Sequence, residues 1–159
     1  YTLADVINAG CRDGELDVRG VSHRGYYASI TDFKSYHDAN MDLIDYKTAT
    51  DLFHDNWPIY TRTNNSCPTH YFDTANVSNS VISNGSMIEG TVENSIVGRG
   101  CTIKKGAVIK NCVVLADCTI GENVHIENLV VDKHAKITHA KEIIRPADEP
   151  GYIKRNDTL

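Results

Sequence analysis

Seven histidines carry the imidazole groups of this sequence that could perform acid–base or metal chemistry. Their spacing contains neither the H-x-x-x-H nor the HExxH pattern that brings two imidazoles to one metal ion, so the sequence predicts no metal site. Those in the second half of the chain lie between regularly spaced apolar residues, which favours a solvated outer surface over a catalytic role. The histidines are His23, His37, His54, His70, His125, His134 and His139.

The five cysteines indicate reduced thiols. They are odd in number and form no C-x-x-C pair, which favours a reducing compartment over a disulfide framework or a zinc site. Cys101 and Cys118 fall one repeat apart, close enough for a disulfide by distance alone, but two small buried thiols are the favoured interpretation. The cysteines are Cys11, Cys67, Cys101, Cys112 and Cys118.

Phosphate-binding motifs are also missing from the sequence. It contains no Gly-rich phosphate loop, no G-x-S-x-G and no kinase-like set. Lys104, Lys105 and Lys110 are neighbours in the repetitive region. We expect them on a solvated face, with a phosphate-bearing ligand as the alternative.

Composition excludes several classes of protein. The chain has 159 residues, of which 41% are hydrophobic and 23% charged, so it can bury a core. A net charge of −5 argues against nucleic-acid binding, and no apolar run approaches the ~18 residues of a membrane span. The first residues show no signal-peptide pattern and no initial Met, from which we expect a piece of a cytoplasmic protein.

From about Val77 onward the sequence repeats itself. Apolar residues recur every five or six positions, and a shift of 17 residues places the later ones in register. Three short strands per repeat, joined by tight corners, would form a triangular coil that pairs its backbone with the coils above and below. The aligned apolar triplets are Val97, Val114 and Val131; Ile103, Ile120 and Ile137; and Ile109, Ile126 and Ile143.

This hexapeptide pattern resembles the left-handed parallel β-helix, which we expect over residues 74–145 of a mainly β chain. An antiparallel sandwich is the alternative, but it would not keep one phase over so many short units. Two further ladders are expected. One consists of small inward residues at Cys101, Cys118 and Ala135, and the other of corner asparagines, which tolerate a left-handed backbone, at Asn94, Asn111 and Asn128.

The first 60 residues have a mixed α and β character. Helical spacing of apolar residues alternates with short stretches of strand-like pattern. Asp32 precedes the clearest helical pattern and is expected to be its N-cap. The expected elements are a helix containing residues 3–7, a strand over 16–21, a helix over 33–44 and a helix over 48–54.

Two motifs in this region resemble one enzyme family. Residues 25–30 read G-Y-Y-A-S-I, and residues 36–43 read Y-H-D-A-N-M-D-L. They resemble the G-Y-W-x-D-[VI]-G-T and Y-x-x-A-N-M-D-L motifs near the end of the nucleotidyltransferase domain of bacterial glucose-1-phosphate adenylyltransferases, in which a β-helix follows. The resemblance covers the chain from about Leu16. It implies an α/β remnant of that domain at residues 1–45, a linker at 46–73 and a capping tail at 146–159.

Departures from the family motif imply a loss of catalysis. Ser29 stands where the family has an Asp that helps to hold the divalent metal, and Tyr27 replaces a Trp that lines the sugar-phosphate pocket. A neutral hydroxyl is a poor ligand for the Mg²⁺ that complete catalytic members use. The resemblance therefore implies a non-catalytic, regulatory D-type subunit of glycogen biosynthesis, with no cofactor in this part. Its expected partner is a catalytic subunit, in a hetero- or homo-oligomer.

A regulatory subunit of this kind implies a phosphorylated effector. The cationic pair Lys154 and Arg155, in the tail, is the expected site, with two solvated charges near a chain end as the alternative. Two other functions stay open. One is a hexapeptide-repeat acyltransferase, in which His125 would deprotonate the acceptor, and the other is a structural assembly module without a ligand.

Overall fold

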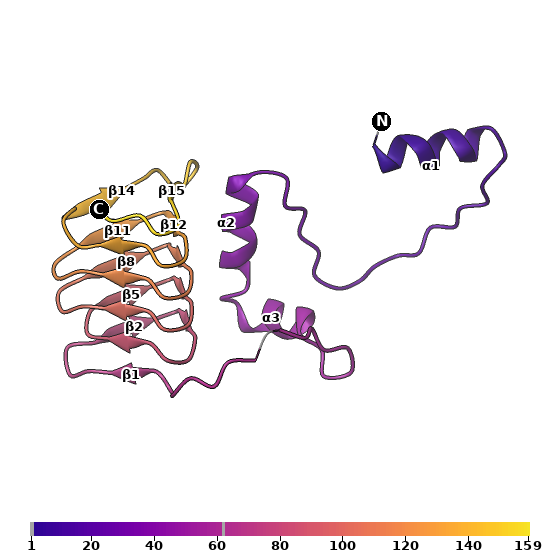
Figure 1. Cartoon of the computed structure of the whole chain (residues 1–159). Coiled ribbons are helices and arrows are strands. Elements are labelled where there is room, and N and C mark those ends of the chain that lie inside the picture. The colour runs from indigo at the N-terminus through magenta and orange to yellow at the C-terminus, as the bar shows by residue number, and fades with distance from the viewer. Residues whose placement is uncertain (1, 62) are drawn as a thin grey trace.

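The computed structural model describes residues 2–61 and 63–159. Within them, three helices come first and a stack of short strands follows (Figure 1). The helices are α1 (Leu3–Arg12), α2 (Phe33–Asp42) and α3 (Tyr46–Leu52). The strands are β1 (His70–Tyr71), β2 (Asn76–Ser78), β3 (Val81–Ile82), β4 (Met87–Ile88), β5 (Thr91–Glu93), β6 (Ile96–Val97), β7 (Thr102–Ile103), β8 (Val108–Lys110), β9 (Val113–Val114), β10 (Thr119–Ile120), β11 (His125–Glu127), β12 (Leu129–Val131), β13 (Lys136–Ile137), β14 (Glu142–Ile144) and β15 (Gly151–Ile153).

The strands form parallel sheets on the faces of a triangular prism. Each described sheet has five strands, in the orders β1-β4-β7-β10-β13, β14-β11-β8-β5-β2 and β15-β12-β9-β6-β3. Every coil therefore contributes one strand to each sheet. The predicted registers are confirmed, because Ile120 pairs with both Ile103 and Ile137, Ile126 with Ile109 and Ile143, and Val114 with Val97 and Val131. The expected left-handed parallel β-helix is thus confirmed.

The interior of the prism is an uninterrupted apolar core. The inward isoleucines of the central coils, such as Ile103 and Ile120, have no solvent exposure, and each contributes roughly 1.5–3 kcal/mol by its burial. The ladder of small residues predicted at Cys101, Cys118 and Ala135 is buried as expected. Burial raises the pKa of the Cys112 thiol to about 12, so this group is an inert filler of the core.

Asparagines shape one corner of each coil. The three that were predicted to take left-handed backbone do so, with φ of 44° at Asn94, 50° at Asn111 and 55° at Asn128. Their side chains also link the coils, because Asn79 Nδ2 donates to Asn94 Oδ1 at 2.8 Å and Asn94 Nδ2 donates to Asn111 Oδ1. Asn therefore serves both the conformation and the stacking of this corner.

The C-terminal tail continues the β-helix. Strand β15 pairs with β12, and Leu159 exchanges backbone hydrogen bonds with residues 136 and 138 across the last coil. Of the two neighbouring apolar residues of β15, Ile153 is buried, at 8% exposure. Tyr152 remains 50% exposed, because neighbouring residues of a strand point to opposite faces.

The N-terminal helices lie outside the prism (Figure 1). Asp32 caps α2 as predicted, although α2 ends at Asp42 and α3 begins at Tyr46, two residues before the expected position in each case. The strand predicted over residues 16–21 was wrong, because these residues are exposed and have no regular structure. A strand requires a neighbouring strand for its backbone, and no such partner lies beside this segment in the described part of the chain. The described helices are too short to span a membrane.

Candidate functional site

The three faces of the β-helix differ in their outward residues. On the sheet β15-β12-β9-β6-β3 the outward position is apolar in every coil, with Val81, Ile96, Val113, Val130 and Tyr152 in one row. Val113 is fully buried and Val130 is 2% exposed, although neither belongs to the interior core. Outward apolar residues that are nevertheless buried must be covered by another element. We call this row the docking face.

Helix α2 covers the docking face. It contacts β9 beside the prism (Figure 1), and the Nε2 atom of His37 lies 2.8 Å from the carbonyl oxygen of Asn111. At the start of the helix, Phe33 packs edge-on against Tyr152, with ring centroids 5.6 Å apart. His37 is the one buried residue of the described helices, at 5% exposure. The helix is therefore anchored by the polar contact of His37 and the aromatic contact of Phe33, in addition to its packing on β9.

The sequence around α2 explains why a helix forms there. Asp32 accepts a hydrogen bond from the backbone N–H of Ser35, and the Ser35 hydroxyl accepts one from the backbone N–H of Asp32. This reciprocal capping box fixes the first turn, and the bond from Ser35 lowers the pKa of Asp32. An ion pair between Lys34 and Asp38 supports the exposed side one turn later.

The segment that carries the motif residues Tyr27 and Ser29 lies against α2 and α3. The Tyr26 hydroxyl donates to Asp42 Oδ2 at 3.0 Å, and the Tyr26 backbone N–H donates to Asp51 Oδ2 at 2.9 Å. Partial burial and the neighbouring Asp42 raise the pKa of Tyr26. Between this segment and the two helices lies an apolar hollow of about 370 Å³. It is lined by Tyr26, Tyr27, Ala28, Ile30, Ala39, Asn40, Leu43 and Leu52.

The residues of this hollow do not fit a divalent metal. Tyr27 is 78% exposed and Ser29 is also exposed. The nearby carboxylates of Asp42 and Asp51 are already occupied by Tyr26. Among residues 2–61 and 63–159, no three His, Cys, Asp or Glu side chains are grouped so that they could hold a metal ion. We therefore derive no catalytic step through Mg²⁺ for this segment.

The cationic pair predicted as an effector site lies away from this hollow, at the end of β15. Lys154 and Arg155 are both exposed. Next to them, Asp132 accepts a hydrogen bond from the Tyr152 hydroxyl at 2.7 Å and one from the Lys133 backbone N–H at 2.6 Å. The bond from Tyr152, followed by smaller effects that include Arg155, lowers the pKa of Asp132. The structure brings Lys154 and Arg155 together with Asp132, and not with Tyr27 or Ser29.

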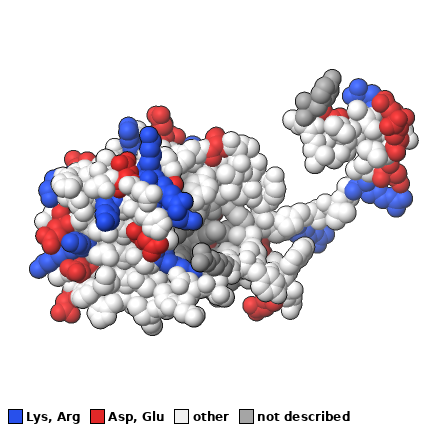
Figure 2. Space-filling model, in the orientation of Figure 1, with Lys and Arg blue, Asp and Glu red and all other residues white. Residues whose placement is uncertain are grey.

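The remaining predicted residues lie on solvated faces. His125 Nε2 is 2.7 Å from Glu127 and its Nδ1 is 3.7 Å from Glu142, so both ring nitrogens face carboxylates. That arrangement leaves neither nitrogen directed at an acceptor substrate. Lys110 pairs with Glu93 at 3.2 Å, and Lys104 and Lys105 are exposed. Figure 2 shows basic and acidic side chains interspersed over the visible face of the β-helix.

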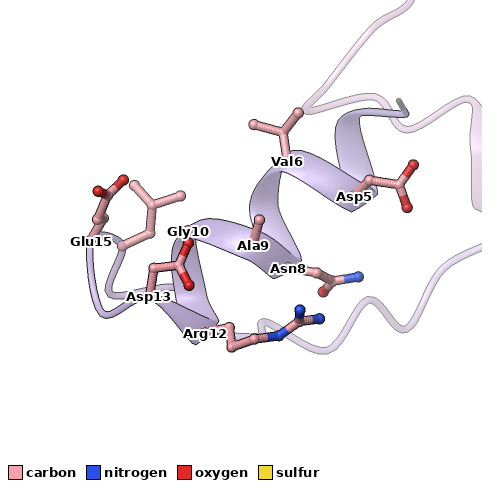
Figure 3. A pocket seen from close by; sticks show the side chains of 9 residues that line it. Asp5, Val6, Asn8, Ala9, Gly10, Arg12, Asp13 and Glu15 are labelled. Carbon is pink, nitrogen blue, oxygen red and sulfur yellow. The ribbon is translucent and has the colours of Figure 1, made fainter.

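A second hollow of about 910 Å³ runs along α1 and the turn after it. Figure 3 shows that its charged side chains do not converge, since Asp5 and Glu15 lie at opposite ends of the helix. Its walls come from one helix and the adjoining turn. It therefore lacks the converging polar groups that a ligand site requires.

Sequence reasoning missed the docking face and His37. The signal that could have found them is a run of two successive apolar residues in the later strands of one sheet, at 96–97, 113–114 and 130–131. In a strand with a solvated outer face, the first residue of such a pair, which points outward, would be polar. A doubly apolar strand therefore indicates that its outer face is covered.

Comparison with known proteins places these features in a family. Glucose-1-phosphate adenylyltransferase from Geobacillus stearothermophilus is 42% identical over 86 residues, which are 54% of this chain and 22% of the relative. Glycogen biosynthesis protein GlgD from Bacillus subtilis is 36% identical over 140 residues, 88% of this chain and 41% of the relative. The adenylyltransferase from Bacillus mycoides is 36% identical over 122 residues, 77% of this chain and 32% of the relative.

The chain thus spans less than half of each of these relatives. The resemblance to glucose-1-phosphate adenylyltransferases is confirmed by these matches. Residues 68–149 also match the family model described as GlmU-like, C-terminal hexapeptide. The chain therefore belongs to the GlmU-like C-terminal hexapeptide family. The relatives to which it is similar include glucose-1-phosphate adenylyltransferases and GlgD.

Proposed function

We propose that this chain is the C-terminal part of a non-catalytic, regulatory subunit of a glucose-1-phosphate adenylyltransferase in glycogen biosynthesis. That reaction joins ATP and glucose 1-phosphate into ADP-glucose and pyrophosphate. The β-helix serves assembly with a catalytic subunit and the response to a phosphorylated effector. The proposed role places the protein in the cytoplasm.

One observation carries the non-catalytic assignment. Ser29 occupies the position at which the catalytic motif has a metal-binding Asp, and Tyr27 occupies that of the Trp. Phosphoryl transfer depends on positioning and on charge stabilisation by metal ions, so loss of a metal ligand removes a main contribution to the rate. The long match to GlgD, whose name states a role in glycogen biosynthesis and no enzymatic activity, supports the same assignment.

The assembly role is supported by the form of the β-helix. The inward positions of the prism are filled mainly by Ile, Val and Cys. Two of its three outward faces are not covered by α2, and β1 and the first coil present an edge with unpaired backbone groups. Such a surface suits contacts between subunits more than it suits chemistry.

The test uses the complete subunit that carries this chain. Pyrophosphate release from ATP, glucose 1-phosphate and Mg²⁺ is measured with the subunit alone, with a catalytic subunit alone and with both at equal concentration. We expect negligible release by the subunit alone and a raised or effector-shifted rate in the mixture, together with a complex in size-exclusion chromatography. Strong release by the subunit alone would overturn the proposal.

A pair of substitutions sharpens this test. Ser29→Asp combined with Tyr27→Trp restores the two motif positions, and we expect it to recover measurable turnover in a complete subunit whose upstream catalytic residues are intact. Ser78→Asp, on the β-helix, is the matched control because Ser78 is exposed, like Ser29, and the change adds the same charge away from the motif. Equal activity of the two variants would show that position 29 does not limit catalysis.

A further inference from the structure

Helix α2 makes contacts with different parts of the molecule at its two ends. Its first residue, Phe33, packs against Tyr152 of the tail strand β15 at 5.6 Å between ring centroids. Its last residue, Asp42, accepts the hydrogen bond from the Tyr26 hydroxyl at 3.0 Å. A helix of ten residues is about 15 Å long and moves as a rigid rod. The helix thus spans the distance between the tail and the segment that carries Tyr27 and Ser29.

The Tyr152 side of the contact with Phe33 is held in place by Asp132. The Tyr152 hydroxyl donates to Asp132 Oδ2 at 2.7 Å, while the other carboxylate oxygen of Asp132 accepts the backbone N–H of Lys133 at 2.6 Å. The ring of Tyr152 is therefore held between Asp132 and Phe33. The hydrogen bond from Tyr152 is the main cause of the lowered pKa of Asp132, and Arg155 makes a smaller contribution.

The middle of the helix supplies a fixed point. His37 is bound to the Asn111 carbonyl oxygen at 2.8 Å, and Val113 and Val130 on the docking face are buried. A rigid rod that is held at its centre converts a displacement at one end into a displacement at the other. Packed elements of this kind shift between discrete positions rather than deform continuously.

We propose that α2 is a coupling element, in which the Tyr152–Phe33 contact transmits the position of the C-terminal tail to residues 26–30 through the Asp42–Tyr26 hydrogen bond. The use of this coupling in effector response rests on the proposed function, whereas the coupling itself is a property of this chain. The ligand class that would act on it is a phosphorylated anion at Lys154 and Arg155. Such an anion would bind next to the end of β15, the strand that carries the Tyr152 ring, and so act on the position of that strand.

The test is hydrogen–deuterium exchange on the 159-residue chain, which requires neither effector nor partner. Tyr152→Ala removes the contact with Phe33. Tyr71→Ala is the matched control, because Tyr71 is 51% exposed and lies on a strand of the β-helix, like Tyr152 at 50%. We expect Tyr152→Ala to accelerate exchange about five- to tenfold in the amides of α2, and also at the Tyr26 amide, which is bound to Asp51.

Two further variants separate the steps of the coupling. Tyr152→Phe keeps the ring but loses the bond to Asp132, and we expect a smaller acceleration at the same amides. Asp42→Ala removes the hydrogen bond to Tyr26, and we expect faster exchange at Tyr26, while the protected amides at the start of α2, such as that of Tyr36, are unchanged.

Each outcome decides the proposal. The coupling is supported if Tyr152→Ala accelerates exchange both in α2 and at Tyr26, and Tyr71→Ala accelerates it at neither place. If Tyr152→Ala leaves exchange in α2 unchanged, the Tyr152–Phe33 contact does not act as a coupling device. If it accelerates exchange in α2 and leaves Tyr26 unchanged, α2 does not transmit the change to residues 26–30. If Tyr152→Ala unfolds the last coil, Tyr152→Phe decides by the same criteria. These results are independent of pyrophosphate release, so failure of the coupling is distinguishable from failure of the proposed function.

Discussion

The β-helix and the N-terminal region differ in where their apolar residues lie. In the central coils of the β-helix the inward isoleucines and valines are fully buried. In the N-terminal region Leu3 is 77% exposed, Val21 is 92% exposed, and α1 has no buried residue. Both regions have well-formed local patterns, including a capping box at the start of α1.

The difference shows what a local pattern can achieve without a partner. A repeat supplies its own packing partner, because each coil is covered by the next coil along the chain. An amphipathic helix stabilises a fold only when another element covers its apolar side. Helix α2 is the exception in the N-terminal region, because the docking face supplies that cover. The chain thus joins a region that is folded by repetition to one in which α2 alone, of the described helices, has a buried residue, where it touches the first.

The largest expected effect comes from breaking the repeat. Ile120→Asp places an unpaired carboxylate in the middle of the core, at a cost of several kcal/mol that is comparable to the ~5–15 kcal/mol of total stability. We expect loss of the cooperative thermal transition, measured by circular dichroism. Thr119→Asp is the control, because the side chain of Thr119, next to Ile120, points outward and is partly exposed. A soluble Ile120→Asp variant with a cooperative transition would contradict the β-helix core.

Removal of the tail is expected to have the next largest effect. Without residues 147–159 the chain loses β15, its bonds to β12, and the burial of Ile153 and Leu159 on the last coil. The exposed backbone of β12 and the uncovered core would then promote association between molecules. We expect larger particles in light scattering and a lower melting temperature. Unchanged solubility and particle size would argue against a capping role for the tail.

A smaller effect should separate the two regions. Val130→Asp puts a charge under α2, on the outer side of a strand whose inward residues are unchanged. We expect α2 to lose its protection from hydrogen exchange while the β-helix still melts cooperatively. Val81→Asp is the matched control, since Val81 lies in the same outward row but is 43% exposed. Equal effects of the two variants would show that the docking face does not hold α2.

Sequence reasoning was most successful where contacts are set by the repeat. The registers of the valine and isoleucine ladders and the left-handed corner at Asn111 follow from spacing alone, since every partner lies a fixed distance along the chain. It failed for residues 16–21, where alternation predicted a strand that has no neighbour. It also missed Tyr152 and His37, whose partners Phe33 and Asn111 are far away in the sequence and follow no period.

The smallest expected effect concerns the bond between Tyr152 and Asp132, and it depends on pH. The folded pKa of Asp132 is lowered below the ~3.9 of an unfolded Asp, so its contribution to stability is present above that value and is lost as the pH falls through the folded pKa. The same bond raises the pKa of Tyr152, so at the alkaline end the contribution is lost as the pH rises past ~10. Because both groups are largely accessible to solvent, the change should be modest and weaker at high salt. We expect the difference in melting temperature between the unmodified chain and Asp132→Asn to shrink between pH 6 and pH 3. The other carboxylates with lowered pKa, such as Asp32 and Asp45, are present in both proteins and cancel in this comparison. A difference that is constant over this range would show that the Tyr152–Asp132 bond does not contribute to stability.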